Sequence, residues 1–134
     1  RDMEQLKSAP DPRATFIEMG RRHLVEEPRE KAILMMELWA EGARNPRIGA
    51  ICGAMDSICK GIMVEFVQQW RRIEGIKGRM PAEEVAELML LLGDGIYRRR
   101  AGSADFDSAA AFASILPIVL DAIGVPQSAV REVA

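Results

Sequence analysis

The sequence predicts an all-α fold, an orthogonal helical bundle of about five helices preceded by the end of a further linker helix. Three observations predict it. Apolar residues recur every three or four positions along each long segment, as on one face of an amphipathic helix. No segment shows the strict alternation of apolar and polar residues that is typical of a half-buried strand. Proline or glycine separates the segments, and 134 residues is a length typical of one domain with its own core.

The composition excludes several classes of function. A net charge of −2, from 18 basic and 20 acidic residues, gives no polyelectrolyte signal for nucleic acid, and no apolar run reaches the roughly 18 residues that a membrane span needs. Cys52 and Cys59 are too far apart on a helix for a disulfide, which fits a reducing cytoplasm, the expected location. With a single histidine, we expect no metal site and no cofactor. The chain starts at Arg1 rather than methionine, so we expect a fragment or a processed chain.

The N-terminal third predicts the end of one helix and two further helices. Residues 1–8 are typical of the end of a linker helix, which the prolines of residues 9–12 stop. The next helix spans about 12–25, with Asp11 as its N-cap and Pro12 at the first helical position. A third covers about 28–43 and carries apolar residues over so wide an arc that we expect burial on two sides.

The longest segment is a single amphipathic helix over residues 45–74, around which we expect the other helices to pack. Asn45 is a good N-cap and Pro46 fits the first helical position. Beside the apolar stripe, small residues recur every fourth position at Gly49, Gly53, Ser57 and Gly61. Glycine inside a helix costs about 1 kcal/mol relative to alanine. The stripe therefore predicts either close packing of a neighbouring helix or open volume beside the long helix.

The C-terminal part predicts a loop, two apolar helices and a tail. After the loop, a helix spans about 81–101, and Asp105 is the expected cap of a last helix over 106–123. Pro117 should kink that helix, and Gly124 should end it in the left-handed conformation. The predicted domain is therefore 1–124, followed by a tail over 125–134.

These last two helices are apolar over most of their surface, which predicts a partner chain. The rest of so small a domain covers only one side of each helix, so we expect a two-fold homodimer in which they form a four-helix bundle. The alternative is an outer face of ordinary exposed alanines. The residues expected at the interface are Met89, Leu92, Gly93, Ile96, Phe112, Ile115, Leu116 and Val119.

Two runs of sequence resemble the ligand-binding half of the tetracycline-repressor (TetR) family of transcription regulators. Residues 37–46, ELWAEGARNP, are similar to the family's Leu-Trp-Ala-Glu run before the break into its long central helix. Residues 80–88, MPAEEVAEL, continuing to LLGDGI at 91–96, are similar to its penultimate helix. Helix order and lengths agree over about residues 1–124. The resemblance implies an effector-binding and dimerisation domain of a regulator, usually a repressor.

The sequence departs from the family at its N-terminus. Nothing in it resembles the helix-turn-helix domain with which family members begin, so the resemblance implies that operator DNA is contacted only through an N-terminal domain absent from this chain. It also implies that a bound effector changes the spacing of the two linker helices and releases DNA. The three consecutive arginines, residues 98–100, complement the C-terminal end of a helix dipole and are expected to be solvated rather than to contact DNA.

The sequence offers candidates for lining a site for a hydrophobic or aromatic effector: methionines, aromatic residues and the lone histidine. Methionine adapts to varied apolar shapes, and tryptophan offers a broad surface with one donor. For each residue plain core packing is an alternative, and for the histidine a surface position. The candidate lining residues are Phe16, Met19, His23, Met35, Trp39, Met55, Cys59, Ile62, Met63 and Phe66.

Catalysis is not predicted. The sequence has no nucleophile turn and no phosphate-binding glycine loop, since Gly93-Asp94-Gly95 lies inside a predicted helix and follows no strand. The competing hypothesis is a structural helical dimerisation module that has a dry core and takes no small-molecule ligand.

Overall fold

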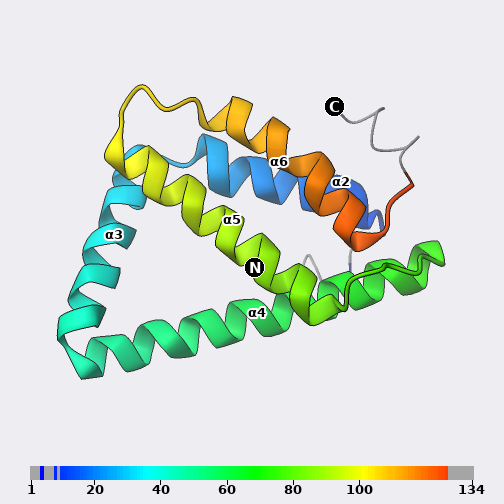
Figure 1. Cartoon of the computed structure of the whole chain (residues 1–134), viewed down its shortest axis with the longest axis horizontal. Coiled ribbons are helices and arrows are strands. Elements are labelled where there is room, and N and C mark those ends of the chain that lie inside the picture. Colours follow the sequence, from blue (N-terminus) through cyan, green and yellow to red (C-terminus); the bar gives the residue numbers. More distant parts are fainter. Residues whose placement is uncertain (1–3, 5–7, 9, 127–134) are drawn as a thin grey trace.

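The structure is a computed structural model that describes residues 4, 8 and 10–126, and every regular element in this part of the chain is helical (Figure 1). This confirms the all-α prediction. The predicted linker helix lies outside the described residues, apart from Glu4 and Ser8, whose amide donates to the Glu4 carbonyl at 3.2 Å. The elements are α2 (Pro12–Arg21), η1 (Arg22–Glu26), α3 (Arg29–Arg44), α4 (Pro46–Glu74), α5 (Ala82–Gly102) and α6 (Ser108–Ile123).

The helix predicted over residues 12–25 is present, but its last turn is π-helical rather than α-helical. Asp11 caps α2 as expected, accepting from the Ala14 amide at 3.0 Å, with Pro12 in the first turn. From Arg22 the helix widens into the π-helical turn η1, which leads to the start of α3. Gly20 allows α2 to lie close against α6, since a β-carbon there would come within 2.7 Å of the Phe112 ring.

The third helix is less buried than the sequence predicts. Among the residues of α3, only Ala32 is fully buried, while Leu34 and Leu38 are 61% and 39% exposed. The reason is that α3 packs mainly against α4 and α5, which lie on the same side of it (Figure 1). The prediction of burial on two sides is therefore wrong.

The long helix α4 has the ends that its sequence predicts. The Asn45 side chain accepts from the Arg47 and Ile48 amides at 3.1 and 3.4 Å, and Gly75 ends the helix with φ +64°. Its two halves differ in burial. The C-terminal half carries the three buried residues, while the N-terminal half exposes three large apolar side chains to about half of their surface: Ile51, Met55 and Ile58.

The last helix begins two residues later than expected and reaches further into the core. Asp107 rather than Asp105 caps α6, accepting from the Ala110 amide at 2.9 Å. Gly124 has the predicted left-handed backbone, with φ +109°. Val125, assigned to the tail, is only 2% exposed and belongs to the core. The remaining predicted tail, residues 127–134, lies outside the described part.

One core joins the C-terminal half of α4, the start of α5 and the inner face of α6. It contains Val67, Trp70, Val85, Leu120 and Ile123, all of which are essentially inaccessible to solvent. Figure 1 shows α2 and α6 lying together above α5, while α3 and the N-terminal half of α4 extend away from this layer and form two sides of a triangle with α5. The fold therefore has a packed end and a thinner arm.

Candidate functional site

The candidate lining residues fall into two groups. Five of them lie in the core or pack against it: Phe16, Met19, Ile62, Met63 and Phe66. Four lie on the arm formed by α3 and the N-terminal half of α4 and are not in the core cluster: Met35, Trp39, Met55 and Cys59. His23 lies in η1, at the corner between α2 and α3. The structure therefore brings together half of the predicted set at the packed end.

The center of the packed end is an aromatic cluster, defined here as Phe16, Phe66 and Trp70. The Phe16 and Phe66 rings are stacked, with centroids 6.3 Å apart, and both rings meet the indole of Trp70 in tilted arrangements at 5.8 and 5.6 Å. Trp70 is not among the residues that the sequence predicts to line a site. Its position four residues after Phe66 puts both side chains on one helix face, which is the signal that would have found it.

Two buried donors at this end have no acceptor. Trp70 is fully buried and its Nε1 has no hydrogen-bond partner, and the same is true of Nε of the half-buried Arg13. A buried donor without an acceptor costs roughly 1–3 kcal/mol, so most such groups in proteins are satisfied by protein, water or ligand. Arg13 precedes Phe16 by three residues, so the two side chains are neighbours on α2. The aromatic cluster therefore carries unused hydrogen-bonding capacity.

A polar network holds the corner at η1. The Glu27 carboxylate contacts the His23 ring nitrogen Nδ1 at 2.9 Å and Nζ of Lys31 at 2.6 Å, and it accepts from the Tyr97 hydroxyl at 3.2 Å. Burial alone would raise the pKa of Glu27, but the hydrogen bonds from Lys31 and His23 outweigh burial and lower it. Burial and the Glu27 carboxylate raise the pKa of Tyr97 to about 12. His23 is thus engaged in a structural network.

An acidic group lies between α4 and α5. Burial raises the pKa of Asp94, and the nearby carboxylates of Asp56 and Glu87 raise it further. Burial also raises the pKa of the Cys59 thiol, with Asp56 and Asp94 adding to the effect. Lys60 pairs with Glu87 at 2.7 Å. Because a raised pKa keeps the Cys59 thiol protonated, this environment does not activate it as a nucleophile.

The stripe of small residues on α4 separates into two parts. At Gly49 a β-carbon would lie 2.7 Å from the Gly42 carbonyl oxygen, so this glycine allows α3 and α4 to cross closely. At Gly53 and Gly61 a β-carbon would meet nothing within 4 Å. Close packing therefore holds at Gly49, whereas the exposed Gly53 and Gly61 face open space on the helix surface.

The predicted dimer residues are mostly used within the chain itself. Ile96, Phe112, Leu116 and Val119 are each less than 10% exposed, and Met89 and Leu92 pack against the core. Gly93 faces Leu24, since a β-carbon there would be 3.8 Å from that side chain, and Ile115 is half-buried. The large apolar residues that α5 and α6 do expose are Leu91 and Ile118, at 61% and 57%. The buried members of the list are thus corrected to core residues.

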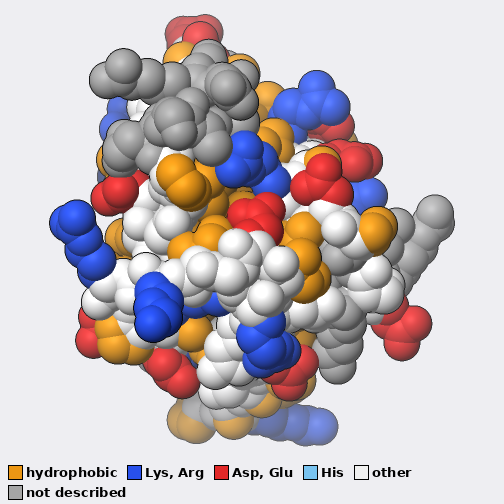
Figure 2. All heavy atoms as spheres, turned by 90° about the vertical axis from the view of Figure 1, so that its right-hand side faces the viewer, with side chains coloured by type: hydrophobic (Ala, Val, Ile, Leu, Met, Phe, Trp, Pro, Cys, Tyr) orange, Lys and Arg blue, Asp and Glu red, His pale blue; other side chains and the backbone are white. Residues whose placement is uncertain are grey.

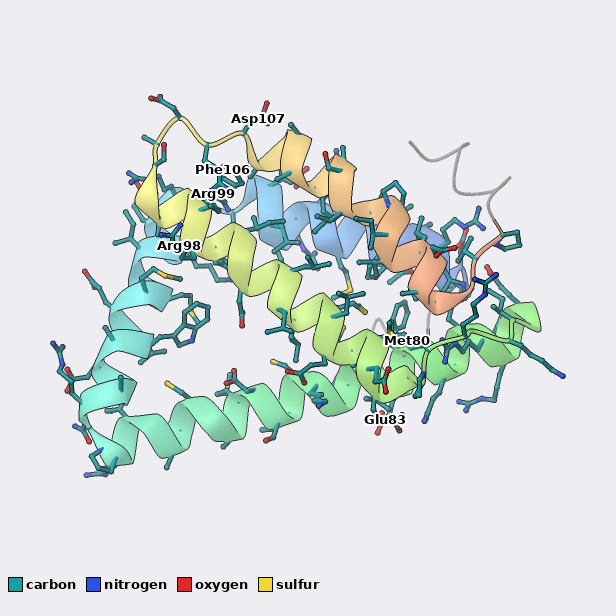
Figure 3. The ribbon with its side chains drawn as sticks, in the orientation of Figure 1. Met80, Glu83, Arg98, Arg99, Phe106 and Asp107 are labelled. Carbon is teal, nitrogen blue, oxygen red and sulfur yellow. The ribbon has the colours of Figure 1, made fainter. Side chains whose placement is uncertain are left out.

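The three arginines at the end of α5 have three different environments. Arg98 is exposed, Arg99 stacks over the Phe106 ring at 4.9 Å, and Arg100 is 8% exposed. Figure 3 shows Arg98, Arg99, Phe106 and Asp107 at one end of α5, with Met80 and Glu83 at the other. The expectation of a solvated helix end therefore holds for Arg98 and is wrong for Arg100.

The charge on the visible surface is mixed. Figure 2 shows basic and acidic side chains interspersed on the face at the C-terminal end of α4, with apolar side chains between them. No helix in the described ranges is long and apolar enough to cross a membrane. Within those same ranges, no group of three or more histidine, cysteine or carboxylate side chains is placed to hold a metal ion.

Comparisons with known proteins give no relative. No family model matches the chain, and neither the curated proteins nor the solved structures contain a match.

Proposed function

We propose that this chain is the effector-binding and dimerisation domain of a transcription regulator of the tetracycline-repressor family, usually a repressor. The observation that carries the proposal is the position of the two similar sequence runs in the fold. Residues 37–46 form the end of α3 and open the long helix α4, while residues 80–96 open α5 after its loop. These are the places in the helix order that the resemblance implies for them.

The effector is a small hydrophobic or aromatic molecule bound beside the aromatic cluster. Phe16 and Met19 are half-buried on α2, and Ile62 and Met63 are half-buried on α4. Half-buried methionines can repack around an apolar molecule at little cost, because the side chain is flexible and polarizable. Such a site joins α2 to α4 and offers apolar surface from both helices.

The mechanism follows from the position of α2. A molecule that fits one spacing of α2 and α4 better than another shifts the population toward that spacing. Through α2 the shift reaches the residues that precede it and, in a full-length regulator, the DNA-reading heads. Operator half-sites lie about 34 Å apart or a multiple of that distance, so a small pivot of the heads releases DNA. An effector that leaves operator affinity of the full-length regulator unchanged would contradict this mechanism.

The dimer forms through the outer faces of α5 and α6, with Leu91 and Ile118 at its center. Native mass spectrometry of the Leu91→Glu variant tests this surface, and Leu34→Glu is its matched control, because both leucines are 61% exposed on α-helices. We expect the original chain and Leu34→Glu to be dimers and Leu91→Glu to be a monomer, since a buried unpaired carboxylate opposes association. A monomeric original chain, or a dimer that survives Leu91→Glu, contradicts this interface.

A thermal-shift screen against a library of hydrophobic and aromatic compounds tests the effector. A ligand at about 100 times its dissociation constant adds roughly 2.7 kcal/mol to the free energy of unfolding. The Met63→Ala variant should lose the shift, while Met55→Ala should keep it, because Met63 packs against the core and Met55 is 56% exposed on the arm.

A structural dimerisation module without a ligand is the second candidate. It is favoured by the close packing of the aromatic cluster, in which Phe66 is 2% exposed and Trp70 fully buried. No shift with any compound, together with a stable dimer, would select this function over effector binding.

A further inference from the structure

The Trp70 indole offers a donor that its own chain does not use. Trp70 contacts both Phe16 and Phe66 and is fully buried, yet its Nε1 has no hydrogen-bond partner. An indole is a donor only, so what it lacks is an acceptor. Buried groups of this kind are normally satisfied by protein, by an ordered water or by a ligand.

Arg13 supplies a second unused donor beside the same cluster. Its Nε is buried and has no partner, and among the described residues no carboxylate forms an ion pair with it. Arg13 is one helical turn before Phe16 on α2, and Trp70 is one turn after Phe66 on α4. Because α2 and α4 run in opposite directions (Figure 1), these turns lie at the same end of the cluster.

The Trp70 indole is neutral and the Arg13 guanidinium is positively charged, so the charge of Arg13 decides which acceptor fits both donors. Arg13 is a half-buried cation whose Nε is shielded from solvent. A guanidinium favours an anion as its acceptor, and a planar carboxylate matches its geometry best. The acidic group between α4 and α5 is consistent with this choice. Asp56, Glu87 and Asp94 lie between α4 and α5 and would repel an anion, which leaves the Arg13 end for the carboxylate.

We propose that the effector is an amphipathic carboxylic acid whose carboxylate accepts hydrogen bonds from Trp70 Nε1 and Arg13 Nε, while its apolar part packs against Met19 and Met63. This inference rests on the proposed effector-binding function and names the chemical class of its ligand. Both methionines pack against the core and remain half-buried. Each lies about two helical turns, roughly 10 Å, from the donor on its own helix, so they offer adaptable apolar surface to the far end of such a molecule.

Tryptophan resonances report directly on the proposed contact. The chain has two tryptophans, Trp39 and Trp70, so a proton–nitrogen spectrum shows two indole signals and the Trp39→Phe variant identifies that of Trp70. The probes are octanoate and octanol, which share an apolar chain and differ in the carboxylate. We expect octanoate to bind at least about tenfold more tightly than octanol, because its hydrogen bonds are charge-assisted, and to move the Trp70 indole signal downfield.

Two variants separate recognition of the carboxylate from general stability. Arg13→Gln should reduce the preference for octanoate over octanol to less than about threefold. Arg72→Gln should leave it unchanged, because Arg72 is an exposed arginine in the last turn of α4. Circular dichroism confirms that both variants are folded, and the octanol affinity serves as an internal measure of an intact apolar site.

The possible results distinguish this inference from the proposed function. Equal binding of the two probes with an unmoved Trp70 signal overturns the carboxylate and leaves the hydrophobic effector standing. If the Arg13→Gln variant still prefers octanoate to octanol, the proposed recognition of the carboxylate is overturned as well. If neither probe binds, the carboxylate class is wrong, and the broad thermal-shift screen then decides on effector binding separately.

Discussion

Arg29 and Arg100 tie together the corner where α2, α3 and α5 meet. Arg29, in the first turn of α3, donates from Nε to the Arg100 carbonyl at 2.8 Å and from its terminal nitrogen to the Ala101 carbonyl at 2.8 Å. Arg100 in turn donates to the carbonyls of Leu24, at 3.3 Å, and of Glu27. Each arginine therefore satisfies backbone oxygens at the end of another element, which are otherwise left without partners.

Arg100→Met should destabilise the domain by about 2–3 kcal/mol, because it leaves the Leu24 and Glu27 carbonyls without their donor in a mostly buried place. Arg98→Met is the matched control, two residues earlier and exposed, and should change the free energy of unfolding by less than about 0.5 kcal/mol. Urea unfolding followed by circular dichroism measures both values. Equal effects of the two substitutions would show that the bonds of Arg100 contribute nothing to stability.

Tyr97 should lose its proton only at high pH, and the free energy of unfolding should fall as it does so. Its pKa is raised from 10.0 to about 12, so the folded state favours the neutral hydroxyl that donates to the His23 carbonyl at 3.1 Å and to Glu27. For an acid with a raised folded pKa, the stabilisation is present below the unfolded pKa and is lost as pH rises from there through the folded pKa. Tyr97 is the only tyrosine in the chain, so the tyrosinate absorbance titrates this residue alone.

Tyr97→Phe removes both of these hydrogen bonds and should cost about 1–2 kcal/mol at neutral pH. Above pH 10 the difference from the original chain should shrink, because the original chain loses its own contribution there. A tyrosinate transition near pH 10 in the folded protein would contradict the buried network around Glu27.

Much of the helix arrangement follows from local chemistry and is therefore readable in the sequence. Asn45 and Pro46 define the start of α4, and Gly75 and Gly124 end helices with positive φ, because each effect depends only on residues nearby in the chain. The cap of α6 was misplaced because both Asp105 and Asp107 satisfy the same local rule. The choice of Asp107 is settled by the path of the α5–α6 loop.

The candidate site was only partly predictable, since it depends on contacts between distant segments. The apolar pattern marks Trp39 and Trp70 equally as inward residues, but Trp70 lies in the closed core while Trp39 lies on the thinner arm. The π-helical turn at His23 has no signature in the residue pattern. That the Arg13 and Trp70 donors lack an acceptor can be recognised only from the three-dimensional positions of the groups around them.

Asp94→Asn should stabilise the domain at neutral pH. The folded-state pKa of Asp94 is raised above 3.8, so the ionised carboxylate opposes folding once pH exceeds that raised value. Since Asp94 is only partly removed from solvent, screening by water limits the gain to about 0.5 kcal/mol. The gain should shrink as pH falls through the folded pKa and vanish below 3.8, where the carboxyl is neutral in both states. Asp105→Asn, in the exposed α5–α6 loop, should show no such pH-dependent gain in thermal unfolding.

The glycines of α4 should respond to alanine in opposite directions. At Gly53 the added methyl group meets nothing within 4 Å, so alanine should raise the free energy of unfolding by about 1 kcal/mol through its higher helix propensity. At Gly49 the same methyl group would lie 2.7 Å from the Gly42 carbonyl oxygen, so Gly49→Ala must push α3 away from α4 and should destabilise by about 1–3 kcal/mol.

Denaturant unfolding of the two alanine variants measures this contrast within one helix, with the same chemical change at positions four residues apart. If Gly53→Ala destabilises as well, then a neighbouring group fills the space beside it in solution. A bound molecule or a partner chain would have this effect, and repeating the measurement on the monomeric Leu91→Glu variant separates the two, because only a partner chain is lost there.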